Sequence, residues 1–152
     1  MRVSVIGGST VSDEQHATAR EVGRLLAEAG HEVVCGGRGG VMEAVCRGAS
    51  ERGGHTIGIL PGDRVEGAND YVDTPIATGL GYARNVLVVR NSRAVIAVDG
   101  ATGTLSELAF ALDFGRPVAG LDTHRIEGVE HVDSPAAAVE YVETVATATA
   151  SR

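Results

Sequence analysis

The sequence predicts a Rossmann-like three-layer α/β domain, in which a parallel sheet carries helices on both faces. Short apolar runs alternate with segments whose apolar residues recur at helical spacing, as expected when helices connect parallel strands. The 21 glycines fall in clusters after the apolar runs, where tight strand-to-helix turns require them. Since 43% of the residues are hydrophobic but only 3% are aromatic, we expect a core of Val, Leu, Ile and Ala. The 152 residues favour one domain spanning 1–152.

The first 60 residues read as three strands separated by two helices. Strands are expected at 3–6, 31–35 and 55–60, each closed by glycine or proline-glycine. A helix over about 13–29 would place one apolar stripe inward, with Ser12 and Gln15 as a capping box and Gly30 as its stop. A second helix would begin at Val41 and stop at 53–54.

The pattern weakens between 63 and 79, where we expect a loop and a short strand at 71–74. A helix over about 82–91 and a strand at 94–98 follow. The next helix is marked by apolar residues from Leu105 to Leu112 and is followed by a strand at 117–121. The last helix would start at Pro135, a favoured first helical residue, and run to about Val145, leaving 146–152 as a frayed tail.

Three glycine-rich turns follow strands, at 7–9, 36–40 and 100–103. The carboxyl ends of parallel strands share one edge of the sheet, so these turns should converge there. Helix starts at such an edge present unpaired N–H groups and the positive end of the helix dipole, which suits a phosphate. The predicted ligand-binding residues are Gly7, Gly8, Ser9, Gly36, Gly37, Gly39, Gly40, Gly100, Thr102, Gly103 and Thr104.

Arg84 and Glu107 are the charged residues that could face the same ligand, and we take them as the candidate catalytic pair. Each also has a purely structural interpretation. Thr104-x-x-Glu107 has the spacing of a capping box, and Arg84 is equally consistent with a solvated helix residue or a surface ion pair. Asp99, at the strand end, could cap the turn or repel a phosphate.

Composition excludes several classes of protein. The net charge is −7 and all basic residues are arginine, so no lysine exists for a pyridoxal-phosphate Schiff base or a Walker-type phosphate contact. An acidic chain also argues against general nucleic-acid binding. The five histidines and two cysteines lack metal-ligand spacing, and we expect neither a metal nor a cofactor.

The predicted location is the cytoplasm, without a membrane segment. The longest apolar runs fall well short of the ~20 residues of a membrane-spanning helix. The chain opens on a strand and its turn rather than on a signal peptide, and two isolated thiols fit a reducing compartment.

The segment 84–107 resembles the signature of the lysine decarboxylase-like superfamily, which includes the cytokinin-activating nucleoside 5′-monophosphate phosphoribohydrolases. That signature is an arginine–lysine pair, a strand, and then Pro-Gly-Gly-x-Gly-Thr-x-x-Glu. The matching residues are Arg84, Gly100, Gly103, Thr104 and Glu107. The turn at 36–42 is similar to the family's earlier glycine-rich turn.

Three residues depart from the signature: Asn85 replaces the lysine, Asp99 the proline and Ala101 the second glycine. The sequence is closer to a short branch similar to molybdenum-cofactor carrier proteins and, more distantly, to DNA-processing protein A. The resemblance implies that Arg84 positions the ligand's phosphate or stabilises charge. It implies that Glu107 contacts ribose hydroxyls or assists departure of the base. It also implies a homo-oligomer, a dimer or tetramer.

Two functions stay open at this point. The first is an enzyme that hydrolyses the N-glycosidic bond of a nucleoside monophosphate. The second is a carrier or sensor that holds a phosphorylated nucleotide-like small molecule, such as a molybdenum cofactor, without turnover. A DNA-associated role is a weaker third possibility, because the sequence has no basic stripe.

Overall fold

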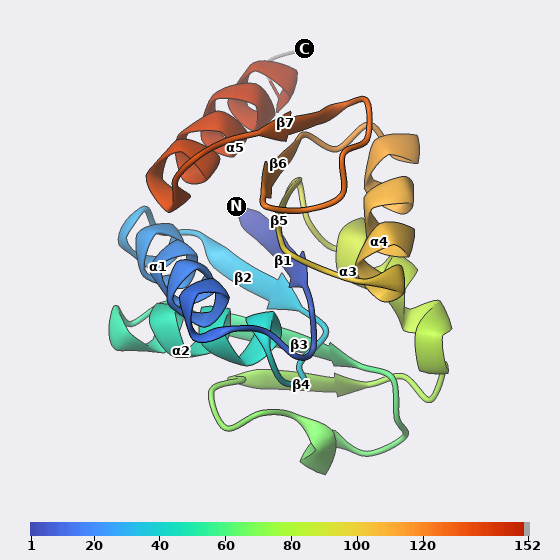
Figure 1. The fold of residues 1–152 in the computed structure, drawn as a ribbon. Coiled ribbons are helices and arrows are strands. Elements are labelled where there is room, and N and C mark those ends of the chain that lie inside the picture. Colours follow the sequence, from blue (N-terminus) through green and yellow to red (C-terminus); the bar gives the residue numbers. More distant parts are fainter. Residues whose placement is uncertain (151–152) are drawn as a thin grey trace.

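Seven strands form one parallel sheet in the order β4-β3-β2-β1-β5-β6-β7 in the computed structural model, which describes residues 1–150 (Figure 1). Strands β2, β3 and β4 are added in turn on one side of β1, and β5, β6 and β7 are added in turn on its other side. Strand order therefore reverses between β1 and β5, the place where ligands bind in open α/β sheets. The strands are β1 (Arg2–Gly7), β2 (Glu32–Cys35), β3 (Thr56–Leu60), β4 (Thr74–Ala77), β5 (Ala94–Val98), β6 (Val118–Leu121) and β7 (Val129–His131).

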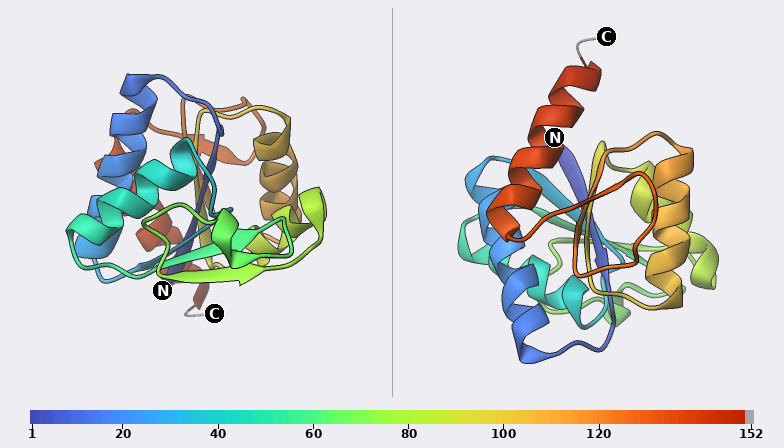
Figure 2. Two further views of the ribbon diagram at one scale, coloured as in Figure 1. Left: turned by 90° about the horizontal axis from the view of Figure 1, so that it is seen from below. Right: turned by 45° about the horizontal axis from the view of Figure 1, so that its top comes forward.

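Helices cover both faces of the sheet, which confirms the predicted three-layer Rossmann-like α/β fold (Figure 2). Alternate residues of each strand feed two cores: Val3 and Ile96 pack under α1, α2 and α5, whereas Ile6 and Val95 pack with α3 and α4. The helices are α1 (Asp13–Glu28), α2 (Val41–Glu51), α3 (Asn85–Arg90), α4 (Thr102–Asp113) and α5 (Pro135–Ala150), with 3₁₀ turns η1 (Val65–Gly67) and η2 (Gly81–Arg84).

Two glycines let α1 and α2 pack in direct backbone contact. A Cβ at Gly48 would lie 1.9 Å from the carbonyl oxygen of Arg20, and one at Gly23 would lie 2.1 Å from that of Val45. No side chain fits in either gap, so the two helices approach more closely than larger residues would permit.

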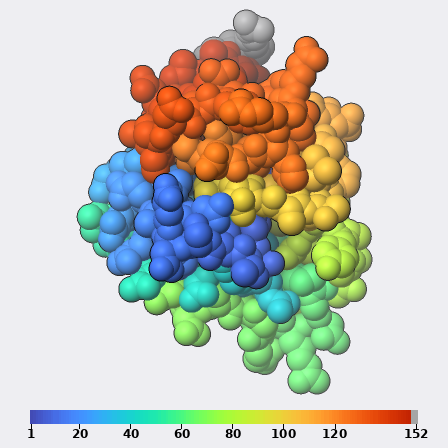
Figure 3. Space-filling view, viewed as in Figure 1, coloured from blue at the N-terminus to red at the C-terminus, as the bar shows by residue number. Residues whose placement is uncertain are grey.

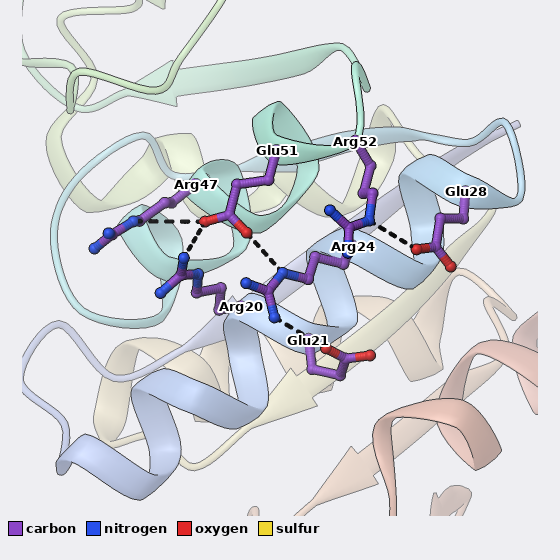
Figure 4. Close-up of polar contacts among 7 residues, drawn as sticks. All are labelled: Arg20, Glu21, Arg24, Glu28, Arg47, Glu51 and Arg52. Atoms are coloured by element: carbon purple, nitrogen blue, oxygen red, sulfur yellow. Dashed lines mark hydrogen bonds and ion pairs between the residues drawn. The ribbon is translucent and has the colours of Figure 1, made fainter.

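Ion pairs join the outer sides of the same two helices (Figure 4). Glu51 of α2 accepts hydrogen bonds from Arg20 and Arg24, with Arg24 Nε 2.6 Å from Glu51 Oε2, and Arg47 Nε lies 3.7 Å from Glu51 Oε1. The hydrogen bond from Arg20 is the main reason that the pKa of Glu51 lies below its ordinary value. The predicted capping box at the start of α1 is confirmed, since Ser12 and Gln15 exchange hydrogen bonds.

The structure differs from the predicted elements in the fourth strand, in an additional seventh strand and in the end of the last helix. The fourth strand lies at Thr74–Ala77 rather than 71–74, because Tyr71 O and the Asp73 carboxylate are hydrogen-bonded by Thr56 in a bent connection. A seventh strand, Val129–His131, was not predicted. Helix α5 continues to Ala150 instead of ending near Val145, and its Ala146 is buried against the sheet. Positions 151 and 152 of the predicted frayed tail lie outside the described residues.

No helix in the part of the chain that the structure describes is long and apolar enough to cross a membrane.

Candidate functional site

A cavity of about 550 Å³ lies between the end of β1 and the start of α4. Its size is typical of small-molecule sites, and its place is the reversal of strand order between β1 and β5. Figure 3 shows the chain's first residues, in blue, at the surface beside the yellow and gold segment near residue 100. The predicted site residues that line the cavity are Gly7, Gly8, Ser9, Gly36, Arg84, Thr102, Gly103, Thr104 and Glu107.

Four predicted ligand-binding glycines, Gly37, Gly39, Gly40 and Gly100, are not among the lining residues. Gly40 has a φ of +65°, and a Cβ there would lie 2.2 Å from the carbonyl oxygen of Gly8. It therefore brings the turn at 36–40 against the turn after β1. Gly100, with a φ of +123°, lies similarly close to Thr104. These two glycines shape the wall of the cavity.

Helix α4 begins beside the cavity without a side-chain cap. Its N-cap residue is Ala101, and the first backbone bond runs from Leu105 N–H to Ala101 O. The N–H groups of the first turn therefore remain available to an anion, and the helix dipole favours one. The capping-box interpretation of Thr104 and Glu107 is wrong, because they are the third and sixth residues of the helix.

Arg84 is a buried wall residue of the cavity, only 9% exposed, so both structural interpretations made from its sequence position are wrong. Its Nε donates to Ile59 O at 2.9 Å, its Nη2 donates to Gly36 O at 3.5 Å, and its Nη1 donates to Asn85 Oδ1. Burial lowers the pKa of the guanidinium, while the nearby Glu107 raises it. All three partners are neutral oxygens, so the positive charge stays available to a ligand.

Glu107 projects from the second turn of α4 and is 8% exposed. Burial raises the pKa of its carboxyl to about 7, although the positive charge of Arg84 opposes the rise. No hydrogen bond or ion pair holds this carboxyl among the described residues. A carboxyl that titrates near neutrality in a cavity can act as an acid or as a base.

Sequence reasoning missed several lining residues, notably Met42 and Ser106, and it noted Asn85 only as a departure from the signature. Tyr82 also lines the cavity, although the residue is 87% exposed. Adjacency to Arg84 and to Glu107 was the available signal for Asn85 and Ser106. Within residues 1–150, no group of three or more His, Cys, Asp or Glu side chains could hold a metal ion.

The fold and the glycine-rich cavity define a Rossmann-like protein with a candidate small-molecule site at the reversal of strand order. Residues 1–149 match the SLOG cluster4 family, and the chain belongs to that family.

Two relatives show how far the sequence similarity extends. An uncharacterised protein of Archaeoglobus fulgidus is 44% identical over 142 residues, 93% of each chain. A protein of Oryza sativa named probable cytokinin riboside 5′-monophosphate phosphoribohydrolase is 33% identical over 112 residues. That match covers 70% of this chain and 46% of the rice protein.

Solved structures are similar to this chain over nearly its full length. The molybdenum cofactor binding protein of Rippkaea orientalis is 35% identical, with a TM-score of 0.89 and coverage of 95% of this chain and 96% of that one. The molybdenum cofactor carrier protein of Chlamydomonas reinhardtii is 33% identical, with a TM-score of 0.88 and coverage of 96% and 98%. DNA processing protein A of Helicobacter pylori, at 19% identity and a TM-score of 0.71, covers 97% of this chain and 80% of its own, and shares the fold.

Proposed function

We propose that this protein binds a nucleoside 5′-monophosphate in the cavity and hydrolyses its N-glycosidic bond. The observation that carries the proposal is the pairing of two buried charged residues, Arg84 and Glu107, beside the uncapped start of α4. The two side chains interact electrostatically but make no ion pair in the described structure. Both side chains line the same cavity, so a single ligand could contact both of them.

The ligand's phosphate would accept hydrogen bonds from the N–H groups at the start of α4, with Thr102 and Gly103 nearest the helix end. A Cβ at Gly103 would meet only Asn85 Nδ2, at 3.8 Å, so the backbone there is open to close approach. Arg84 would supply the one buried positive charge of the cavity wall to the phosphate or the ribose.

Glu107 would serve the bond cleavage itself. With a pKa of about 7 it exists in both protonation states near neutral pH. The C1′–N bond breaks, water adds to C1′, and one proton ends on the departing base. Protonated Glu107 can give that proton, and its anion can stabilise the positive charge that develops on the sugar.

The direct test is to incubate the protein with AMP and related monophosphates in low and in high KCl, and to measure the released free base by chromatography. Glu107→Gln keeps the size of the side chain but replaces the ionisable carboxyl with an amide that cannot act as an acid or a base. We expect this variant to lose at least about 100-fold in kcat/KM. A wild-type protein that releases no base, or a variant as active as wild type, would overturn the enzymatic proposal.

A second candidate function, carriage of a molybdenum cofactor-type ligand without turnover, is favoured by two observations. Two structural neighbours that match nearly the full chain are a molybdenum cofactor binding protein and a molybdenum cofactor carrier protein. Asp99 also departs from the hydrolase signature: its backbone φ of +54° is one that proline cannot adopt, and its Oδ2 lies 3.0 Å from where a Cβ at Gly8 would stand. Tight binding of a phosphorylated pterin without base release would support this function.

We further propose a homo-oligomer, because Tyr82, a large cavity residue, is 87% exposed in the single chain. Light scattering on purified protein would test this, and a monomer at working concentrations would contradict it.

A further inference from the structure

The guanidinium of Arg84 is held by one side chain and two backbone carbonyls. Ile59 lies in β3 and Gly36 directly follows β2, so both carbonyls lie at the carboxyl edge of the sheet. The third acceptor is Asn85 Oδ1. An arginine offers five N–H donors, and three are used here, which leaves two for a ligand.

Asn85 connects that guanidinium to α4. It is 3% exposed and begins α3. A guanidinium can only donate hydrogen bonds, so the amide must turn Oδ1 toward Arg84 and Nδ2 away from it. Nδ2 then donates to Ser106 Oγ at 3.2 Å, and Ser106 Oγ donates to Gly103 O at 2.7 Å.

The result is a continuous chain of hydrogen bonds from Arg84 through Asn85 and Ser106 to the first turn of α4. One end is the charged group of the cavity wall, and the other end is the turn that would bind the phosphate. Neither connecting side chain carries a charge, so the connection leaves the charge of Arg84 uncompensated.

We propose that Asn85 and Ser106 form a positioning pair, which holds the guanidinium of Arg84 at a fixed place relative to the phosphate-binding turn of α4. This inference rests on the proposed function of the cavity. Both residues line the cavity, but the role proposed for them is to set the distance between the phosphate site and the guanidinium of Arg84. Asparagine suits the position because an aspartate of the same shape would neutralise Arg84.

The first test is a pair of serine variants. Ser106→Ala removes the hydroxyl and should lower kcat/KM for AMP about tenfold, the size expected for a broken hydrogen bond in a network to a charged group. Ser106→Thr keeps the hydroxyl and should restore most of the rate. The matched control is Ser92→Ala, which removes a buried serine hydroxyl bonded to Val89 O outside the cavity and should leave the rate unchanged.

The second test does not need turnover. Asn85→Asp places a carboxylate on Arg84, so the positive charge that lowers the pKa of Glu107 is cancelled. The titration midpoint of the Glu107 carboxyl, followed by ¹³C NMR, should then rise above the wild-type midpoint, and AMP binding measured by calorimetry should weaken at least tenfold.

The two tests separate the possible failures. A wild-type protein that releases no base overturns the enzymatic proposal, and the titration of Glu107 still tests the positioning pair. If Asn85→Asp is folded and both Glu107 and AMP affinity behave as in wild type, the positioning proposal is wrong. If Asn85→Asp does not fold, the serine variant decides: Ser106→Ala with the same rate as wild type would overturn the positioning proposal. If wild type shows no turnover, the same AMP affinity in Ser106→Ala and in wild type would overturn it.

Discussion

Replacing Glu107 with glutamine should change how the stability of the protein depends on pH. The ordinary pKa of the side chain is 4.5 and burial raises it to about 7 in the folded protein. Below pH 4.5 the carboxyl is protonated in both the folded and the unfolded chain and contributes no difference. Between 4.5 and 7 the unfolded chain ionises first, so the wild-type protein loses stability as the pH rises.

The size of this loss follows from the two pKa values. Each pH unit is worth ~1.4 kcal/mol, so the interval from 4.5 to about 7 corresponds to ~3 kcal/mol. Glutamine does not ionise, so the stability of Glu107→Gln minus that of wild type, called the margin here, should rise by ~3 kcal/mol between pH 4 and pH 8.

Urea unfolding at each pH measures this margin, because all other titrating groups are common to the two proteins. Glu51→Gln is the matched control. The pKa of Glu51 lies below its ordinary value, so its contribution is present above pH 4.5 and is lost as the pH falls. Its margin should therefore have the opposite dependence on pH. A margin for Glu107→Gln that stays constant within about 0.5 kcal/mol would refute the assignment of Glu107 as a buried carboxyl.

Three further predictions concern the turns, the helix pair and the guanidinium. In urea denaturation, Gly40→Ala should destabilise the protein by at least about 2 kcal/mol, because the new Cβ would meet the carbonyl oxygen of Gly8. Gly53 also has a positive φ, +70°, but has open space around it, so Gly53→Ala should destabilise the protein by only about 1 kcal/mol. Glu51→Gln should lower the thermal midpoint at pH 7, and the difference should shrink in high KCl; equal differences in low and high salt would contradict this. Arg84→Lys should weaken AMP binding at least tenfold by calorimetry, since an ammonium cannot reproduce the planar set of contacts; an unchanged Kd would contradict it.

The alternation of apolar runs and helical stripes predicted most of the fold, because the five inner strands of this sheet, β1, β2, β3, β5 and β6, are buried on both faces. Val95 and Ile96 point to opposite cores, and both are fully buried. Strands of this kind appear in the sequence as uninterrupted apolar runs. The edge strands lack that signal. β4 is exposed or half-buried along its length, and β7 has three residues with one, Val129, in the core, so neither stands out from a loop.

Glycine position predicted where the cavity lies but not which glycines face it. A turn after a strand can need glycine for three reasons: close approach to a ligand, a positive φ, or close packing against a neighbouring backbone. A glycine in the sequence does not show which of these reasons applies. Gly36 lines the cavity, while Gly40, four residues later, is fixed by the backbone of Gly8. Only the three-dimensional arrangement separates these uses.

The role of Glu107 depended on where α4 begins, and that boundary is the least determined feature of a helix in sequence. With Thr104 as the N-cap, Glu107 would have been the third helical residue and its carboxyl would have bonded the helix start. With Ala101 as the N-cap, the same carboxyl lies one turn further along, away from the free N–H groups and inside the cavity. A shift of three residues therefore turns a capping residue into a buried acid with a pKa of about 7. The same shift leaves the start of α4 uncapped, so the place for an anion and the acid beside it have a single structural cause.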